Sequence, residues 1–347
     1  NFKMVCNSEF FLKLKSLFEK KLPFVSYKLP DSDILELHFS SKKIIRKFFL
    51  NENGFVIMPF ENKKGYIIPK GTTLKTEITT QKKKALLENS LSISNEMLNH
   101  RTAYIKQVED AIVQISKTEM EKVVCSQSFE VKANEIKCLK YFKKLLNLYP
   151  DAFNYLFYHP NEGFWIGASP ETLLNLDNDR LMTMALAGTK KRNVLEWKTK
   201  EIFEQKIVEN YIKKNLNVFC SSLKISKRKT VLAGKIEHLK TVLCGTTKHS
   251  PFELINAIHP TPAVAGMPKE LALSFIKKNE PHDRSFYSGY LGAVNGNNCN
   301  LYVNLRCANI KGSMAKVFVG GGITKDSVPE NEWEEIVLKS NTILNVL

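Results

Sequence analysis

The stretch from residue 152 to residue 192 decides the fold: AFNYLFYHP (152–160), GFWIGASPETLLNL (163–176) and RLMTMALAGTKKR (180–192). Aromatic and aliphatic residues fill each segment, and only two or three residues separate one segment from the next, a pattern typical of successive strands. Because no helix lies between them, these strands favour antiparallel pairing over a parallel fold in which strands and helices alternate.

The chain before this stretch predicts two helices and several short strands. Residues 7–22 predict one helix, and the polar stretch 75–120 predicts a second that runs into a strand at KVVCS (122–126). Three runs alternate apolar and polar residues, as half-buried antiparallel strands do: DILELHFS (33–40), GFVIMPF (54–60) and GYIIP (65–69).

The chain after this stretch predicts a helix over 196–215, then alternating helices and strands, and finally a helix that begins at Pro329. The many neighbouring strands predict large antiparallel sheets covered by helices. Neither an internal repeat nor a low-complexity linker marks a boundary. We therefore expect a single domain over residues 1–347, with residues 1–119 as its N-terminal part.

The chain is strongly basic. Its 347 residues include 51 Lys and Arg against 35 Asp and Glu, a formal net charge of +16. Such a balance suits a nucleic acid, an acidic membrane surface or an anionic small substrate. The basic residues are mostly scattered lysines, without zinc-ligand spacing or an RNA-binding aromatic signature. A solvated lysine surface is the favoured interpretation, ahead of an anionic substrate and then a nucleic acid.

Seven cysteines without C-x-x-C spacing predict a reducing compartment, and they argue against a disulfide framework or a zinc site. The first 24 residues lack the apolar core of a signal peptide. No apolar run reaches eighteen residues, the length that a membrane helix needs. We expect a soluble cytoplasmic protein with no membrane partner.

Glutamates gather at the start of the last helix, in PENEWEEIVLK (329–339). The ordinary interpretation is a solvated face, because the macrodipole and the free N–H groups of any helix start favour negative charge. Spacing offers another interpretation. Glu332 and Glu335 are three residues apart and share a face, with Lys339 one turn further along it. Two converging carboxylates can hold a hard cation such as Mg2+.

A second acidic pair strengthens the metal interpretation. In KEIFEQKIV (200–208), Glu201 and Glu204 are again three residues apart on an expected helix. If the two helices converge, they supply up to four carboxylates around one Mg2+, with positions left for water and an anionic ligand. Charged pairs at this spacing are also common on solvated helices.

Four features are unusual for plain core strands: Lys122 opens an apolar strand, Glu171 follows Ser-Pro, Arg306 interrupts LYVNLRCANI (301–310), and Gly320, Gly321 and Gly322 follow a strand. Each has an ordinary interpretation. Lys122 would reach solvent, and Glu171 would start a helix. Arg306 would form a buried ion pair, and the glycines would form a simple turn. An arginine in an apolar strand needs an anion, however, either a buried carboxylate or a ligand. A glycine loop can also present bare N–H groups to a carboxylate or phosphate.

Seven blocks in one order carry a family resemblance: KVVCS (122–126), GASPETLL (167–174), ALAGTKKR (185–192), KEIFEQKIV (200–208), HPTPAVAGMPKELALSFIKKNEPHDRSFYSGYLG (259–292), LYVNLRCANI (301–310) and VFVGGGITKDSVPENEWEEIVLKSNTIL (317–344). They resemble the chorismate-binding enzymes, and within that family most closely the isochorismate synthases. The resemblance is strong over 120–347 and weak before it. The long block at 259–292, followed by the glycine-rich strand and E-W-x-E, is highly specific.

The resemblance implies an α/β fold of the α+β type, a four-layer α/β/β/α sandwich with two large antiparallel sheets face to face. It implies Mg2+ as the cofactor, with Glu204 and Glu335 as ligands and Glu201 and Glu332 as partners, directly or through water. Trp333 lies on another face of the same helix, where we expect it to pack.

The resemblance also implies a small-molecule partner, chorismate, and a monomer that binds no nucleic acid. Chorismate carries two carboxylates, which arginine and N–H groups at one end and Mg2+ at the other would match. The implied contacts are Arg306, Tyr287, the backbone of Gly320 and Gly322, and Lys339 at the carboxylates, and Gly188, Thr189 and His238 around the ring.

The implied reaction converts chorismate to isochorismate: water adds at C2 of the ring while the C4 hydroxyl leaves and the double bonds move. Lys122 resembles the general base, so burial or a nearby cation must lower its pKa. Glu171 resembles the general acid, which burial should keep protonated.

Single positions separate the subgroups of the family. Aminodeoxychorismate synthases typically have a nucleophilic lysine where this chain has Ala187, and anthranilate synthases lack the lysine that corresponds to Lys122. Salicylate synthases keep the equivalents of Lys122 and Glu171 and also eliminate pyruvate, so they remain the alternative. A basic nucleic-acid-binding protein on the same fold is the non-enzyme alternative, although retention of the acid, the base and the metal ligands speaks against it.

The chain departs from common family patterns at three positions. Gln127 stands where arginine is frequent, Gln205 where histidine often follows the metal-binding glutamate, and Phe318 where tyrosine is frequent. These departures put the details of the pocket and the rate in doubt, but not the class of reaction.

Overall fold

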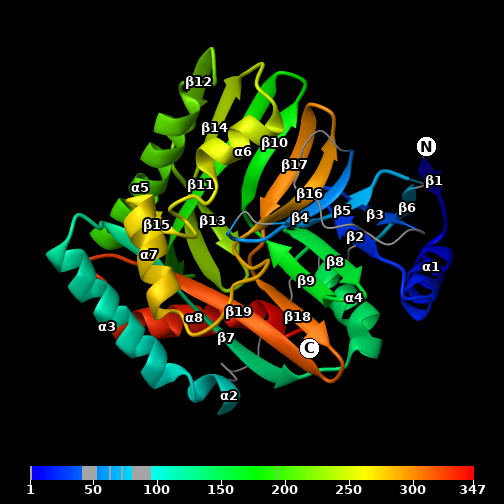
Figure 1. Ribbon diagram of the computed structural model, residues 1–347, viewed down its shortest axis with the longest axis horizontal. Coiled ribbons are helices and arrows are strands. Elements are labelled where there is room, and N and C mark those ends of the chain that lie inside the picture. Colours follow the sequence, from blue (N-terminus) through cyan, green and yellow to red (C-terminus); the bar gives the residue numbers. More distant parts are fainter. Residues whose placement is uncertain (1, 41–52, 62–63, 72, 80–94, 193) are drawn as a thin grey trace.

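The protein is represented by a computed structural model that describes residues 2–40, 53–61, 64–71, 73–79, 95–192 and 194–347. Two large sheets form its centre (Figure 1). The ten-stranded sheet contains, in spatial order, β1 (Phe2–Met4), β6 (Thr73–Glu77), β3 (Ile34–Phe39), β2 (Phe24–Lys28), β8 (Phe153–His159), β9 (Gly163–Ser169), β18 (Cys307–Lys311), β19 (Met314–Ile323), β7 (Lys122–Lys132) and β15 (Gly266–Met267).

The nine-stranded sheet contains, in spatial order, β12 (Ser222–Ile225), β14 (Ile236–Thr246), β11 (Arg180–Lys191), β10 (Thr172–Asp177), β17 (Asn298–Val303), β16 (Tyr290–Asn295), β4 (Gly54–Met58) and β5 (Tyr66–Pro69), with β13 (Lys229–Ala233) paired to β14. Only β1 and β6 pair in parallel among the described strands. All other described pairings are antiparallel. The short connections account for the pairs of consecutive strands, such as β8–β9 and β10–β11.

Helices cover the outer face of each sheet, which gives four layers (Figure 1). The ten-stranded sheet contacts α1 (Asn7–Glu19), α2 (Asn95–Leu98), α3 (Arg101–Lys117), α4 (Cys138–Leu148), α7 (Lys269–Asn279) and α8 (Pro329–Leu344). The nine-stranded sheet contacts α5 (Thr199–Leu216) and α6 (Pro251–Ile258). A 3-10 turn, η1 (Glu135–Lys137), precedes α4. The predicted α/β/β/α sandwich is confirmed.

Aromatic side chains fill the space between the two sheets. The rings of Phe153 from β8 and Tyr302 from β17 stack with centroids 4.1 Å apart, and those of Tyr27 from β2 and Phe55 from β4 lie 5.0 Å apart. All four residues are buried. Such large apolar faces contribute most of the driving force for packing one sheet on the other.

Two of the points at which the chain changes sheets lie next to each other. β9 belongs to the ten-stranded sheet and β10 to the nine-stranded one, so the chain crosses at Pro170 and Glu171. It crosses again between β17 and β18, at residues 304–306. The crossings lie side by side, because the Val303 N–H donates to the Glu171 carbonyl at 3.0 Å and the Ala168 N–H donates to the Arg306 carbonyl at 3.1 Å.

The structure corrects three interpretations of single segments. Glu171 does not start a helix but lies at a sheet crossing. Arg306 does not lie within a strand: it lies between β17 and β18, with φ at 50°, where the backbone turns from one sheet to the other. Gly320, Gly321 and Gly322 do not form a loop after a strand, because they pair with β7 inside β19. Local apolar patterns do not show where a strand breaks to change sheets.

Several predicted segments agree with the structure within a few residues. The helices predicted at 7–22 and 196–215 are α1 and α5. Of the polar stretch 75–120, residues 80–94 lie outside the described residues, and the rest includes α3. Among the described helices, none has the length and apolar character needed to span a membrane.

A buried ion pair fixes the segment between α7 and β16. The guanidinium of Arg284 donates to both carboxylate oxygens of Glu280, at 2.8 and 2.5 Å, and the exposed fractions of these side chains are 3% and 2%. Arg284 also donates to the carbonyls of Val264 and Val124. Glu280 in turn accepts from the Ser126 N–H at 2.9 Å.

We expect Glu280→Gln to lower the free energy of unfolding by about 3 kcal/mol, because it leaves a buried guanidinium without its counter-charge. Urea unfolding measures this value. Glu330→Gln is the matched control, since the Arg101–Glu330 pair is 43% and 57% exposed, and such pairs contribute less than about 1 kcal/mol. Equal losses in both variants would contradict the assigned role of burial.

Candidate active site

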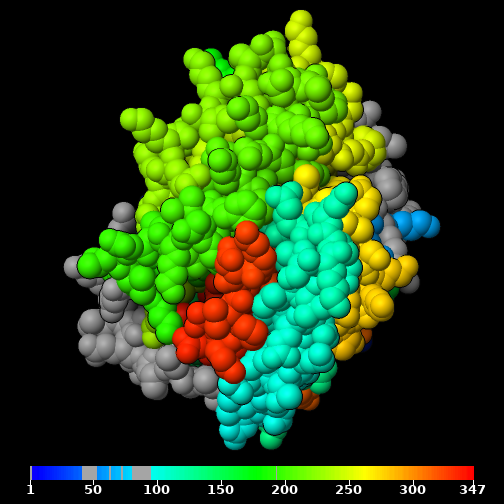
Figure 2. All heavy atoms as spheres, turned by 90° about the vertical axis from the view of Figure 1, so that its left-hand side faces the viewer, coloured from blue at the N-terminus to red at the C-terminus, as the bar shows by residue number. Residues whose placement is uncertain are grey.

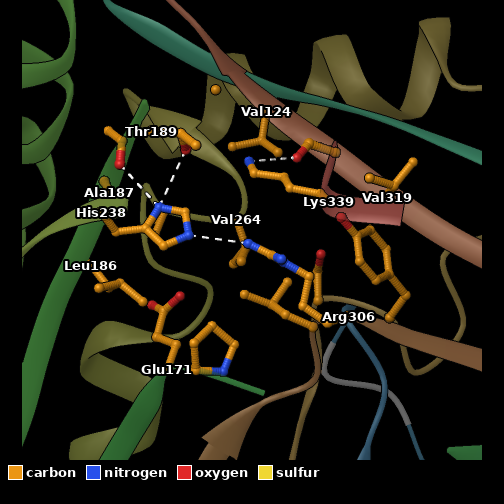
Figure 3. Close-up of a pocket in the computed structure, with 18 of the residues that line it drawn as sticks. Val124, Glu171, Leu186, Ala187, Thr189, His238, Val264, Arg306, Val319 and Lys339 are labelled. Atoms are coloured by element: carbon orange, nitrogen blue, oxygen red, sulfur yellow. Dashed lines mark hydrogen bonds between the residues drawn. The ribbon is translucent and has the colours of Figure 1, made fainter. Parts of the chain in front are cut away.

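A cavity lies beside the two crossings, between strands of both sheets (Figure 3). Ten of the fourteen candidate positions line it: Glu171, Gly188, Thr189, Glu204, His238, Tyr287, Arg306, Gly320, Gly322 and Lys339. The other four, Lys122, Glu201, Glu332 and Glu335, lie against this set through the contacts described below. The structure therefore brings all fourteen positions into one region.

Glu171 lines the cavity from the sheet crossing between β9 and β10. Its residue is 2% exposed, and its backbone N–H donates to Ser169 Oγ at 3.3 Å. Burial raises the pKa of its carboxyl to about 8, although Lys122 and Lys339 act in the opposite direction. Glu171 therefore carries a proton at neutral pH, as a general acid must.

Lys122 is the first residue of β7 and is fully buried. Met267 of β15 pairs beside it, so the side chain does not reach solvent as a lysine at a strand end ordinarily would. Its Nζ lies 3.1 Å from Glu204 Oε1. Burial lowers the pKa of Lys122, with help from Lys200 and Lys339, while Glu204 opposes the shift. This is the direction that a lysine base requires.

His238 of β14 lies between Thr189 and Arg306 (Figure 3). Its Nδ1 is 3.0 Å from the Gly188 carbonyl and 3.3 Å from Thr189 Oγ1. Because a carbonyl only accepts, Nδ1 carries the hydrogen. Burial, Arg306 and Lys339 lower the pKa of His238 to about 3, so the ring is neutral and its Nε2 accepts from Arg306 at 3.1 Å.

The contacts of Arg306 hold its guanidinium in the cavity wall. One terminal nitrogen donates to His238, and the other donates to Thr342 Oγ1 on α8 at 3.1 Å. Burial lowers the pKa of Arg306 to about 10, which still leaves the group charged at neutral pH. No carboxylate among the described residues forms an ion pair with it, so a cation is available to an anionic ligand.

The glycines of β19 leave room for other side chains of the site. A Cβ at Gly322 would lie 2.2 Å from Glu204 Oε1 and 2.9 Å from Lys122 Cε, and a Cβ at Gly320 would lie 2.9 Å from the Tyr287 hydroxyl. Lys339 of α8 donates to the Gly320 carbonyl at 3.0 Å. In the described sheet, β18 pairs with β19 only as far as Phe318, and Gly320 and Gly322 beyond it line the cavity.

Gly188 lies at a bulge in β11, between Ala187 and Thr189. Its φ is +73°, and a Cβ there would lie 2.7 Å from the carbonyl of Glu201. The glycine thus allows the first turn of α5 to approach the sheet closely. It thereby places Glu201 next to the cavity wall.

The two acidic pairs converge, as the metal interpretation requires. Glu201 and Glu204 come from α5, Glu332 and Glu335 come from α8, and Lys200 Nζ bridges the helices at 2.9 Å from Glu332 Oε1 and 3.5 Å from Glu204 Oε2. Figure 2 shows α8 on the surface between α3 and the segment that includes α5. Glu332 and Glu204 are buried, so the solvated-face interpretation is wrong for both.

Charge and burial act against each other in this cluster. Burial alone would raise the pKa of Glu204, but Lys122, Lys200 and Lys339 bring it down to about 2. Burial raises the pKa of Glu332, and the neighbouring charge of Glu335 adds to the increase. Glu335 pairs with Lys339 at 2.6 Å.

The donor set suits Mg2+, which prefers carboxylate oxygens. Glu201 Oε2 and Glu332 Oε2 are buried oxygens without a hydrogen-bond partner among the described residues, which is the state expected of acceptors that await a cation. In the described part of the chain, no three carboxylate, histidine or cysteine side chains already stand as a metal cluster. Lysine ammonium groups instead contact Glu204, Glu332 and Glu335.

Sequence reasoning missed several residues of the site. Lys200 directly precedes Glu201, and its position four residues before Glu204 was a signal that could have found it. Thr342 lies three residues beyond Lys339 on the same helix face. The apolar walls gave no local signal, and they include Val124, Leu186, Ala263, Val264, Leu305 and Val319. Trp333 packs in the core near Tyr104, as predicted.

The three departures from the family pattern lie at different distances from the cavity. Phe318 lines it, stacked on Tyr287 with centroids 5.5 Å apart. Gln127 donates to Gln107 and Gln205 donates to Thr241, and neither belongs to the cavity wall. Only Phe318 therefore acts on the shape of the pocket directly.

A comparison with known families identifies the class of protein to which this fold and site belong. The family described as chorismate binding enzyme matches residues 62–347, most of the chain and all of the site. The chain belongs to the chorismate-binding enzyme family.

The curated relatives described here are all named isochorismate synthase. "Isochorismate synthase MenF" of Haemophilus influenzae is 26% identical over 275 residues, which cover 75% of this chain and 64% of the relative. MenF of Bacillus subtilis is 31% identical over 261 residues, 70% of this chain and 55% of the relative. "Isochorismate synthase EntC" of Escherichia coli is 27% identical over 270 residues, which cover 73% of this chain and 69% of the relative. The chain thus spans less than two thirds of the length of the first two of these relatives.

Solved structures share the fold. DhbC of Bacillus anthracis superposes with a TM-score of 0.80 at 24% identity, covering 96% of this chain and 99% of its own. The menaquinone-specific isochorismate synthase MenF of Escherichia coli gives a TM-score of 0.78 at 21% identity, with 94% and 88% covered. Anthranilate synthase component I of Streptococcus pneumoniae gives 0.69 at 18% identity, with 92% and 90% covered.

Proposed function

We propose that this protein is an isochorismate synthase, which isomerises chorismate to isochorismate with Mg2+ as cofactor. The observation that carries the proposal is a pair of buried groups at one site with oppositely shifted pKa values, Glu171 raised to about 8 and Lys122 lowered. Such a pair can give and take a proton near neutral pH. Ala187 supports the choice, because it stands where aminodeoxychorismate synthases typically have a nucleophilic lysine.

The proposed reaction needs two proton transfers, one from the attacking water and one to the hydroxyl that leaves. Neutral Lys122 takes a proton from the water that adds at C2, and Glu171 gives its proton to the C4 hydroxyl, which leaves as water. The double bonds shift between these two positions, so substrate and product are isomers. Both residues return to their starting states when the proton on Lys122 is released and Glu171 is reprotonated.

The substrate carboxylates would meet different groups of the site. The Arg306 guanidinium, which His238 and Thr342 orient, would bind one carboxylate with the Tyr287 hydroxyl and the β19 backbone nearby. Glu204 and Glu335 would hold Mg2+, with Glu201 and Glu332 beside them. Bound Mg2+ would neutralise the ring carboxylate and the negative charge that develops as the hydroxyl leaves.

Product analysis tests the proposal. The protein is incubated with chorismate in Mg2+ and, separately, in excess chelator, and the products are separated by chromatography. Isochorismate formed only with Mg2+ is the expected result. Salicylate with pyruvate would instead identify a salicylate synthase, and unchanged chorismate in both reactions would refute an isochorismate synthase. If chorismate stays unchanged, tight and steeply salt-dependent binding of a nucleic acid would favour the nucleic-acid-binding alternative.

We expect Arg306→Ala to weaken chorismate binding by roughly 2–4 kcal/mol, because it removes the charged partner of a desolvated carboxylate. The change should raise KM strongly, and thermal unfolding should show a folded variant. Arg101→Ala, at the exposed pair with Glu330, is the control and should keep the wild-type KM. A wild-type KM for Arg306→Ala would show that this arginine is structural.

We also propose one domain over residues 1–347 that works as a monomer in the cytoplasm. Strands from the first 77 residues complete both sheets, which supports a single domain. One chain supplies every candidate site residue, which supports a monomer. All seven cysteines lie in the described part of the chain as free thiols, which suits a reducing compartment.

A further inference from the structure

Among the described residues, Lys200 is the basic residue whose ion pairs join the two acidic helices. It lies in the first turn of α5, and its Nζ contacts Glu332 Oε1 of α8 at 2.9 Å and Glu204 Oε2 of α5 at 3.5 Å. The exposed fraction of its side chain is 11%, against 8% for Glu204 and 4% for Glu332. These contacts form a buried bridge between the helices.

The acidic cluster needs this positive charge. Glu201, Glu204, Glu332 and Glu335 converge here, and the ammonium groups that contact them belong to Lys122, Lys200 and Lys339. Without Lys200, buried Glu332 would have no cation within contact among the described residues. Like charges repel strongly where water is excluded, so the cluster would push α5 and α8 apart.

The same two carboxylates belong to the proposed Mg2+ site. Mg2+ takes its oxygen ligands at about 2.0–2.1 Å, so it cannot bind Glu204 Oε2 and Glu332 Oε1 together while the ammonium group of Lys200 lies between these two oxygens. Lys122 is fully enclosed, and Lys339 is also held by the Gly320 carbonyl. Lys339 is slightly more exposed than Lys200, at 15% against 11%, but its bond to the Gly320 carbonyl holds it in place. Lys200 is partly exposed and has no backbone acceptor among the described residues.

We propose that Lys200 is a resident counter-cation of the metal site: it holds Glu204 and Glu332 together in the metal-free protein and releases them when Mg2+ binds. This inference rests on the proposed function, because it takes both glutamates as part of the Mg2+ site. The ammonium group keeps the empty site folded and neutralised. Its displacement lowers the apparent affinity for Mg2+, as any competing state does.

Mg2+ titration of the metal-free protein tests the proposal. Calorimetry gives the Kd, and thermal unfolding gives the Tm with and without Mg2+, for wild type, Lys200→Met and Lys191→Met. Lys191→Met is the control, because Lys191 also pairs with a glutamate of α8, Glu334, but both side chains of that pair are exposed. We expect Lys200→Met to have a lower metal-free Tm but to bind Mg2+ at least about tenfold more tightly. A lysine that only supports the fold would lower the Tm without tightening Mg2+ binding, and that result would overturn the proposal.

A measurement on the wild type keeps the proposal testable if Lys200→Met does not fold. Acetic anhydride labels free amines, and mass spectrometry quantifies each labelled lysine. Saturating Mg2+ should increase labelling of Lys200 several-fold, because its ammonium group moves out of the carboxylate cluster, while labelling of Lys191 should not change. Unchanged or reduced labelling of Lys200 with Mg2+ bound would overturn the proposal.

Failure of this inference can be told apart from failure of the proposed function. A wild type that binds Mg2+ and releases Lys200 but makes no isochorismate would refute the isochorismate synthase, and the role of Lys200 would stand. A wild type that makes isochorismate while Lys200 stays protected in saturating Mg2+ would refute only the role of Lys200. Absence of any Mg2+ binding would overturn the role of Lys200 as well.

Discussion

Glu171→Gln is expected to lower the rate of chorismate isomerisation about 10²–10⁴-fold, the usual contribution of a general acid. Glutamine keeps the size and much of the hydrogen bonding of the side chain but has no proton to transfer. Because Glu171 is neutral in the folded protein, the variant preserves the charge of the site. Chorismate binding should therefore stay close to that of the wild type, and steady-state kinetics should show a loss in kcat rather than a rise in KM.

The pH profile of Glu171→Gln identifies the acid independently of the rate. Glu171 must be protonated to act, and its pKa is raised to about 8 by burial, so wild-type activity should fall as pH increases through this region. In the variant that alkaline limb should disappear or move. Glu130→Gln, an exposed change on β7, is the control. A variant with near wild-type turnover and an unmoved alkaline limb would show that Glu171 is not the acid.

Lys122→Met is expected to cause a second loss of about 10²–10⁴-fold, because it removes the general base. Methionine fills the buried site without a titratable group. The base acts only when neutral, and the pKa of Lys122 is lowered by burial, so the acid limb of the wild-type profile should belong to this residue. That limb should be lost in the variant.

The Lys122→Met variant also needs a readout for the neighbouring metal site, because Lys122 lies 3.1 Å from Glu204. Removing a positive charge there should not weaken Mg2+ binding measured by calorimetry. Reduced Mg2+ affinity that accounted for the whole rate loss would make Lys122 a support for Glu204 and not the base. In the double variant with Glu171→Gln, the combined loss should be smaller than the product of the single losses, since both groups act in one reaction.

Much of the fold follows from local patterns. Strands of aromatic and aliphatic residues separated by two or three residues predict antiparallel neighbours, and β8, β9, β10 and β11 are such strands. The helices predicted at 7–22 and 196–215 are α1 and α5. The pattern did not show that the chain changes sheets at Pro170 and Glu171. Both strands around that point are buried, and burial on both faces removes the alternation that would distinguish one sheet from the other.

The sequence alone determined the residue types and spacings of the site, since Glu201 and Glu204, like Glu332 and Glu335, are three residues apart on one helix face whatever the rest of the chain does. Only the tertiary structure decided what those side chains meet. The approach of α5 to α8 put Lys200 between Glu204 and Glu332, and two neighbouring sheet crossings, at Glu171 and at residues 304–306, brought Glu171 and Arg306 to one cavity. Burial and charge at each group depend on neighbours far away in the sequence. For that reason the pKa values that make Glu171 an acid and Lys122 a base arise only when the sheets and helices come together.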